Sequence, residues 1–214
     1  MPAAKPESRL KLLDATLKVV REKGYHATRV EDVCLEAGVT KGSFFHHFKS
    51  KEDLALAAVA HWDAYTVEFF ASAPYHAAKD PLARLLAYVD FRKSQLTGDL
   101  HEYSCFAGTI IQEAYETHPQ IAAECARNVA GHAKSLEADI RAAMRDAGVK
   151  GDWTAESLAL HIQGVLQGAF ILAKMKGKPA PAVQSLEHLR RYLELLFARL
   201  SRSKSTKKRT GEGR

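Results

Sequence analysis

Apolar residues recur at intervals of three and four along most of the chain, the spacing that gathers side chains on one face of an α-helix. The first such stretch begins near Ser8 and ends at Gly24. Its apolar face is predicted to carry Leu10, Leu13, Leu17 and Val20. No segment shows the sustained apolar/polar alternation and β-branched enrichment of a strand. The pattern therefore predicts an all-α protein.

Two short helices follow the first one closely. The earlier is expected over 29–37, with Thr28 and Glu31 as a capping box, and the later begins after Thr40 and ends near Phe48. Only residues 38–40 separate them, which is the spacing of a helix-turn-helix. In that motif the second helix enters the DNA major groove, so the pair predicts a DNA-binding unit.

The second helix of this pair divides its residues between packing and recognition. Phe44 and Phe48 lie four residues apart and are assigned to the core. Gly42 removes bulk where the backbone must approach DNA. The remaining positions offer donors and acceptors for phosphates and base edges, namely Thr40, Lys41, Ser43, His46 and His47.

Longer helices occupy the rest of the chain. A fourth, opened by Ser50 with Asp53 three positions later, is expected to run until Pro74. Five more are expected over 81–96, 105–117, 121–147, 154–175 and 183–200, separated by proline and glycine clusters. We therefore predict a three-helix DNA-binding domain over 1–54, extended to about residue 68 by the fourth helix, and a helical bundle for ligand binding and dimerisation over 55–200.

Four segments in the first 54 residues resemble the TetR family of bacterial regulators. They are Gly24-Tyr25-His26-Ala27-Thr28, Val30-Glu31-Asp32-Val33, Ala37-Gly38-Val39-Thr40-Lys41-Gly42-Ser43 and His47-Phe48-Lys49-Ser50-Lys51-Glu52-Asp53-Leu54. The resemblance covers roughly residues 8 to 60, and beyond it only helix number and length are similar. It implies a homodimeric DNA-binding regulator, by family default a repressor, that a small-molecule effector releases from a palindromic operator.

The resemblance also implies roles for individual residues. Thr28 corresponds to a phosphate contact, with Arg29 beside it, and His47 and Lys51 correspond to further backbone contacts. Phe45 stands where the family usually has tyrosine, so that phenolic hydrogen bond is absent and His46 or His47 would have to compensate. The predicted DNA-binding set is Thr28, Arg29, Thr40, Lys41, Gly42, Ser43, Phe45, His46, His47 and Lys51.

The last two helices carry wide apolar stripes, and each exceeds what one neighbour within the chain needs. We expect them to pair across a dimer, with Gly164 and Gly168 permitting close helix crossing. The predicted interface is Leu158, Ile162, Gly164, Val165, Gly168, Leu172, Leu189, Leu193 and Leu196. Two-fold symmetry then requires an inverted-repeat operator.

An effector site is expected where aromatic side chains and a few polar groups surround the centre of the second domain. The candidate residues are Trp62, Tyr65, Phe69, Phe91, Cys105, Phe106, Thr109 and Gln163. An aromatic stripe is also ordinary core, so each assignment competes with simple packing. Cys105 invites a redox or electrophile-sensing hypothesis, but the sequence places no cationic partner beside it.

Charge and cysteine content bear on the tail of the chain, on metal and disulfide sites and on the location of the protein. The net charge is +6, of which residues 201–214 supply +5 from six basic side chains and one acid, so this segment is expected to be a disordered basic tail. Three cysteines without a C-x-x-C spacing indicate reduced thiols, and His101 with Cys105 gives too few ligands for a metal site. No cofactor, secretory signal or membrane segment is expected, and the predicted location is the cytoplasm.

Other functional classes find less support. A helical-bundle enzyme would show paired Glu-x-x-His motifs, and the chain has neither these nor a His-Glu-x-x-His, a phosphate-binding glycine loop or a nucleophile elbow. An architectural protein that only coats DNA would not need some 130 further residues of apolar-rich helix. A transcriptional activator or a constitutive DNA-binding protein of the same fold remains an alternative.

Overall fold

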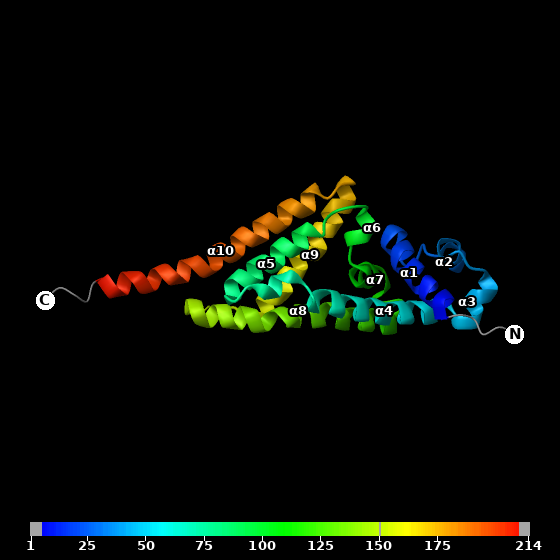
Figure 1. The fold of residues 1–214 in the computed structure, drawn as a ribbon, viewed down its shortest axis with the longest axis horizontal. Coiled ribbons are helices and arrows are strands. Elements are labelled where there is room, and N and C mark those ends of the chain that lie inside the picture. The colour runs from blue at the N-terminus through cyan, green and yellow to red at the C-terminus, as the bar shows by residue number, and fades with distance from the viewer. Residues whose placement is uncertain (1–5, 150, 210–214) are drawn as a thin grey trace. The chain divides into compact units, whose positions relative to one another are not determined.

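The computed structural model describes residues 6–149 and 151–209, and every regular element in them is a helix. In chain order the elements are α1 (Pro6–Lys23), α2 (Val30–Ala37), α3 (Lys41–His47), α4 (Lys51–Ala71), the 3₁₀ helix η1 (Pro74–Ala77), α5 (Pro81–Ser94), α6 (Leu100–Tyr103), α7 (Phe106–Ala114), α8 (Pro119–Ala147), α9 (Ala155–Lys176) and α10 (Ala180–Arg209), as Figure 1 shows. The all-α prediction is confirmed.

The helices form two compact units. The first joins residues up to Ala71 with Gly98–Ala130, and the second joins Ser72–Thr97 with the described residues from Gly131 onward. Helix α8 contributes to both. Residues 98–130, which are distant in sequence, join the first unit because α6 packs against α1 and α7 packs against α1 and α4.

The core of the first unit is centred on α1. Leu12, Leu13, Leu17 and Val20 are buried there, whereas Leu10, expected on the same face, is about half exposed. Phe44, Phe48 and Leu54 bring α3 and α4 into this core, and Phe106 and Ile110 bring in α7. Leu12 is buried and Leu10 is not, so the buried face of α1 is rotated relative to the predicted one.

Several helix boundaries differ from those expected. The short elements η1 and α6 were too brief to give a periodic signal, and Pro119 begins α8 instead of preceding it, since proline is tolerated in the first turn of a helix. Helix α10 continues through residues 201–209, which were predicted to be part of a disordered tail. No proline or glycine interrupts 201–209, and nothing there forces the helix to end. Residues 210–214 of the expected tail lie outside the described residues.

The second unit is built on α9 and α10, which pack against each other, with α10 also lying against α5. Leu158, Ile162, Leu189 and Leu193, predicted to form the dimer interface, are buried within the chain. The prediction chose the wrong face for these four, because periodicity reveals an apolar stripe without saying which neighbour covers it. Helix α9 is also long and apolar enough to cross a membrane by length and composition, a test that the core helix of a soluble protein passes too.

A second apolar face of α9 and α10 is exposed. On α9 it carries Leu160, Gly164, Ile171, Leu172 and Met175, and on α10 it carries Tyr192 and Leu195. The rings of His161 and Tyr192 lie 5.3 Å apart, which shows that the exposed faces of the two helices adjoin. A Cβ added at Gly164 or Gly168 would meet no atom within 4 Å. We call this surface the α9–α10 face.

Candidate nucleic-acid interface

The turn before α2 is held by backbone and side-chain hydrogen bonds. Gly24 has φ +88°, a left-handed conformation that suits glycine. The Thr28 hydroxyl donates to the Gly24 carbonyl at 2.6 Å and is buried. The predicted Thr28 cap with Glu31 is therefore wrong: Arg29 is the N-cap residue, and its amide donates to the Asp32 carboxylate at 2.8 Å.

Asp32 ties this cap to α1. Its carboxylate also accepts a hydrogen bond from Lys23 Nζ at 2.9 Å. The Lys23 contact and, next, the Arg29 amide lower the pKa of Asp32 to about 2. The carboxylate is therefore ionised at neutral pH, where a negative charge in the first turn also suits the helix dipole. The guanidinium of Arg29 remains largely exposed on this surface.

Lys51 at the start of α4 is directed at the same turn. Its Nζ donates to the carbonyl oxygens of Tyr25 and Thr28, both at 3.1 Å, and lies 4.4 Å from the centre of the Tyr25 ring. The ammonium thus satisfies two carbonyls that no helix pairs. This geometry favours a structural role for Lys51 over the expected phosphate contact.

Helix α3 is positioned from both ends. Gly38 ends α2 in the left-handed conformation at φ +65°, and the Thr40 hydroxyl caps α3 by accepting from the Ser43 amide at 3.2 Å. Phe44 is fully buried and Phe48 nearly so, and their rings lie 5.8 Å apart. Both aromatic residues therefore pack in the core as predicted.

The opposite side of α3 faces outward. Thr40, Lys41, Gly42, Phe45 and His46 are exposed, and Ser43 and His47 are half-buried. Phe45 exposes 60% of its surface, which is unusual for a phenylalanine and leaves its ring available for contact. Lys41 forms an ion pair with Glu31, which links the start of α3 to α2.

His47 is less available than His46. Its Nε2 shares a hydrogen bond of 2.7 Å with the Ser8 hydroxyl on α1. Partial burial, followed by the nearby His46 and Arg9, lowers the pKa of His47. A neutral imidazole is thus favoured at neutral pH in the absence of DNA.

Residues of α7 and of the segment just before α8 also contact this turn. The His26 amide donates to the Glu113 carboxylate at 2.9 Å, and His26 Nε2 donates to the Glu113 carbonyl at 3.0 Å. The rings of Tyr25 and His118 meet edge to face, with centroids 5.1 Å apart. These contacts attach α7 directly to the turn that precedes the helix-turn-helix, a connection that sequence spacing could not reveal.

The residues predicted to bind an effector fall into two groups, one in each unit. In the first unit Trp62 lies 6.1 Å from Phe106 and 5.9 Å from Tyr65, and Tyr65 stacks on Phe69 at 5.8 Å. Cys105 caps α7, with its sulfur accepting from the Gly108 amide at 3.3 Å, and the Thr109 hydroxyl donates to the Cys105 carbonyl. Gln163 and Phe91 belong to the second unit.

Gln163 belongs to a buried polar cluster that the sequence did not indicate. Tyr88 and His132 share a hydrogen bond of 2.8 Å, and Gln163 donates to the Tyr88 hydroxyl at 3.5 Å. Burial, and then the nearby Arg92, lower the pKa of His132 to about 3. The imidazole is therefore neutral. Among the described residues, no group of three histidine, cysteine or carboxylate side chains is placed to hold a metal ion.

Comparison with known proteins agrees with this architecture. The family model for bacterial regulatory proteins of the tetR family matches residues 12–58, and the model for a tetracyclin repressor-like C-terminal domain matches residues 81–189. This chain belongs to the TetR family. It is accordingly a transcriptional regulator with a DNA-binding helix-turn-helix, and it is not an enzyme.

Individual TetR-family proteins are similar along most of their length. The transcriptional regulator AcuR of Cereibacter sphaeroides is 26% identical over 183 residues, covering 84% of each chain. The HTH-type transcriptional repressor DhaR of Mycobacterium sp. is 25% identical over 183 residues, covering 86% of this chain and 90% of DhaR. A TetR-family regulator from Agrobacterium tumefaciens has the same fold, with a TM-score of 0.76 and 19% identity over 86% of this chain and 96% of that one.

Proposed function

We propose that this TetR-family regulator is a homodimeric repressor that binds a palindromic operator and leaves it when a small molecule binds. The observation that carries the DNA-binding part is the division of α3, in which Phe44 is buried while Lys41, Phe45 and His46 are exposed. A short helix fixed on its inner side and polar on its outer side can enter a major groove without rearranging.

Phosphate and base contacts are assigned to different residues in this proposal. Arg29 and Lys41 are exposed cations near the starts of α2 and α3, and they contact the DNA backbone. Ser43 and His46 contact base edges, and the exposed ring of Phe45 supplies apolar contact with a thymine methyl group. Thr28 and Lys51 support the motif from within.

The α9–α10 face is the proposed dimer interface. It carries exposed apolar side chains on two adjoining helices, and a Cβ added at either of its two glycines would meet no atom within 4 Å. Pairing two copies through this face forms a four-helix contact, and the two-fold axis then presents two identical recognition helices. The name of the similar protein DhaR, a repressor, supports repression as the sign of control.

Selection of DNA from a random pool by the purified chain tests the proposal. We expect an inverted repeat to be enriched, and Ser43→Ala to change the preferred bases of each half-site. Arg29→Gln should weaken binding to all sequences and flatten its dependence on salt, because a phosphate contact releases a counterion. Enrichment of no sequence at moderate salt would overturn the proposal.

A further inference from the structure

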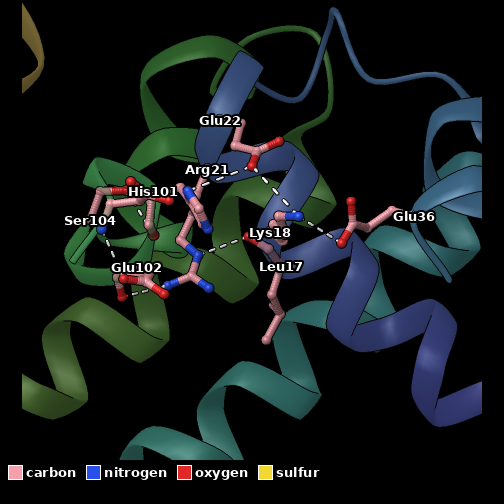
Figure 2. A network of polar contacts seen from close by, with 9 residues as sticks. Leu17, Lys18, Arg21, Glu22, Glu36, His101, Glu102 and Ser104 are labelled. Atoms are coloured by element: carbon pink, nitrogen blue, oxygen red, sulfur yellow. Dashed lines mark hydrogen bonds and ion pairs between the residues drawn. The ribbon is translucent and has the colours of Figure 1, made fainter. Parts of the chain in front are cut away.

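Arg9, near the start of α1, differs from the other basic residues of that helix. The others each contact an oxygen atom of the chain: Lys11 on Glu7, Lys18 on Glu36, Arg21 on the carbonyls of Leu17 and Glu102, and Lys23 on Asp32. Figure 2 shows Lys18 and Arg21 in these contacts. The guanidinium of Arg9 has no carboxylate or carbonyl partner among the described residues. It is exposed and lies 5.4 Å from the centre of the Phe48 ring, so its charge stays available.

The end of α3 meets α1 at the same place. Helix α1 packs against α3, and the Ser8 hydroxyl shares its 2.7 Å hydrogen bond with His47 Nε2. The rings of His47 and Phe48 have centroids 6.3 Å apart. Because the Arg9 guanidinium lies over the same Phe48 ring, the guanidinium and the imidazole adjoin one aromatic side chain. We call Arg9 and His47 the basic pair.

The charges around the basic pair favour an anion. Carboxylates of the adjoining elements contact other groups: Glu7 pairs with Lys11, Glu31 pairs with Lys41, and Asp53 accepts from the Lys49 amide. The charged neighbours that act on His47 are His46 and Arg9, and both are basic. A phosphate would therefore find positive charge at this end of α3.

The place of the basic pair suits the DNA backbone. A recognition helix in the major groove has a sugar-phosphate backbone on each side of it. Helix α3 has seven residues and is about 10 Å long, while the groove is about 12 Å wide. In the proposed interface Arg29 and Lys41 serve the beginning of the motif, and the basic pair lies at the other end of α3. Cations at both ends are therefore within reach of phosphates.

His47 can change its protonation state when a phosphate approaches. Without DNA, partial burial and then His46 and Arg9 lower the pKa of His47. A neighbouring negative charge acts in the opposite direction and favours the protonated ring, as does the end of a helix. A protonated imidazole donates from both nitrogens, and the Ser8 hydroxyl can accept from Nε2, so that contact is kept. Nδ1 has no hydrogen-bond partner in the described part of the chain.

We propose that Arg9 and His47 together bind a phosphate of the DNA backbone, and that His47 takes up a proton when they do. This inference rests on the proposed function, since DNA is the partner. It adds a residue of α1 to the interface and makes DNA affinity depend on pH. The complex holds more protons than the free chain, so affinity rises as the pH falls from 8 toward 6. The rise ends where His47 is protonated in the free chain as well.

The test measures binding of the full chain to the selected inverted repeat at pH 6, 7 and 8 and constant salt. We expect affinity to rise about 3- to 10-fold per protomer between pH 8 and pH 6, and His47→Gln to remove most of this rise. Calorimetry at pH 7 in buffers of different ionisation enthalpy should show proton uptake on binding. Arg9→Gln should weaken binding and flatten its salt dependence by about one phosphate contact per protomer, and Arg9→Lys should restore both.

Matched variants separate the basic pair from other charges. His46→Gln removes the neighbouring imidazole and should keep the pH dependence. Lys18→Gln removes a cation of α1 that already pairs with Glu36, and it should keep the salt dependence. Circular dichroism reports whether each variant is folded. If His47→Gln does not fold, proton uptake by the unaltered chain and by His46→Gln decides the question.

Three results would overturn the inference: affinity that does not change with pH, proton uptake that is lost in His46→Gln and kept in His47→Gln, or a salt dependence that Arg9→Gln leaves unchanged. Enrichment of no inverted repeat contradicts the proposed function instead. The same measurements then use a duplex of arbitrary sequence at low salt, because backbone contacts do not depend on sequence. Absence of binding or of proton uptake there would overturn this inference on its own.

Discussion

Single side chains in this protein reveal roles that residue type alone does not. Lys51 and Arg21 are both cations at helix ends, yet each folds back onto main-chain carbonyls and an aromatic ring. Arg29, by contrast, leaves its guanidinium exposed and uses its amide as part of a helix cap. The distinction between a DNA contact and a structural cation is therefore made by which acceptors of the chain lie within hydrogen-bonding distance of the side-chain nitrogen.

Replacement of Lys51 by methionine tests this distinction. We expect Lys51→Met to lower stability by about 1–3 kcal/mol, because two carbonyls lose a charged donor, and to leave the salt dependence of operator binding unchanged. Urea unfolding and binding titrations at several salt concentrations measure both effects. A flatter salt dependence with unchanged stability would show that Lys51 contacts phosphate.

His132 predicts a pH dependence of stability. Its pKa is about 3 in the folded chain, below the ordinary value of about 6.5. Above pH 6.5 the His132 imidazole is neutral in both the folded and the unfolded chain, so its protonation does not lower the free energy of unfolding. As the pH falls below 6.5 the unfolded chain takes up the proton first, so stability is progressively lost toward pH 3.

Between pH 7 and pH 5 this effect amounts to about 1–2 kcal/mol. His132→Gln should reduce the loss by that amount in urea unfolding at the two pH values, and the exposed His46→Gln should not. Identical pH dependence in His132→Gln and the unaltered chain would remove His132 as the cause.

At the scale of the element, the helices were predictable where their signal was local. The Thr40 cap, the core positions Phe44 and Phe48 and the left-handed Gly38 all follow from short-range rules. The sequence therefore predicts correctly where the recognition helix lies and which of its sides faces the core. The contacts of α7 with the turn at Gly24 join residues nearly 90 positions apart, and no local pattern encodes them.

The same limit applies to the dimer and effector predictions. The stripe through Leu158 and Ile162 is apolar, but whether α10 or a second chain covers it depends on tertiary packing. Gln163 is predicted to line the effector site because it is a polar residue within an apolar helix. The residues of its polar cluster, Tyr88 and His132, lie on other helices, so no local pattern reveals them. Cys105 acquires a cation, Arg21, only through the fold.

The turn between α1 and α2 gives a prediction at this scale. Gly24 and Gly38 both have positive φ, but a Cβ on Gly24 would strike the Glu113 carboxylate, whereas a Cβ on Gly38 meets nothing within 4 Å. Gly24→Ala should therefore cost more stability than Gly38→Ala, which pays only for backbone strain of about 1–2 kcal/mol.

A double variant separates the backbone strain at residue 24 from the collision of the added methyl group with Glu113. The double variant Gly24→Ala with Glu113→Ala should be less destabilised than the sum of the two single variants, because the second change removes the obstacle. Thermal or urea unfolding measures all three. Strict additivity would show that Glu113 does not oppose the added methyl group.

At the scale of the whole molecule, the account depends on pairing through the α9–α10 face. Leu172 and Leu195 lie on it, are 40% and 60% exposed, and would be buried by a second copy. We expect Leu172→Arg and Leu195→Arg to give monomers by sedimentation at micromolar concentration and to lose affinity for an inverted repeat. Tyr115→Arg, an exposed aromatic residue on the first unit, is the matched control and should remain dimeric.

The measurement that tests the central claim most directly is the mass of the complex between the full chain and the DNA sequence selected from a random pool. The account predicts two protomers of 23.6 kDa on one inverted repeat, and loss of stable binding when one half-site is scrambled. A single protomer bound as tightly to one half-site as to the whole repeat would contradict it.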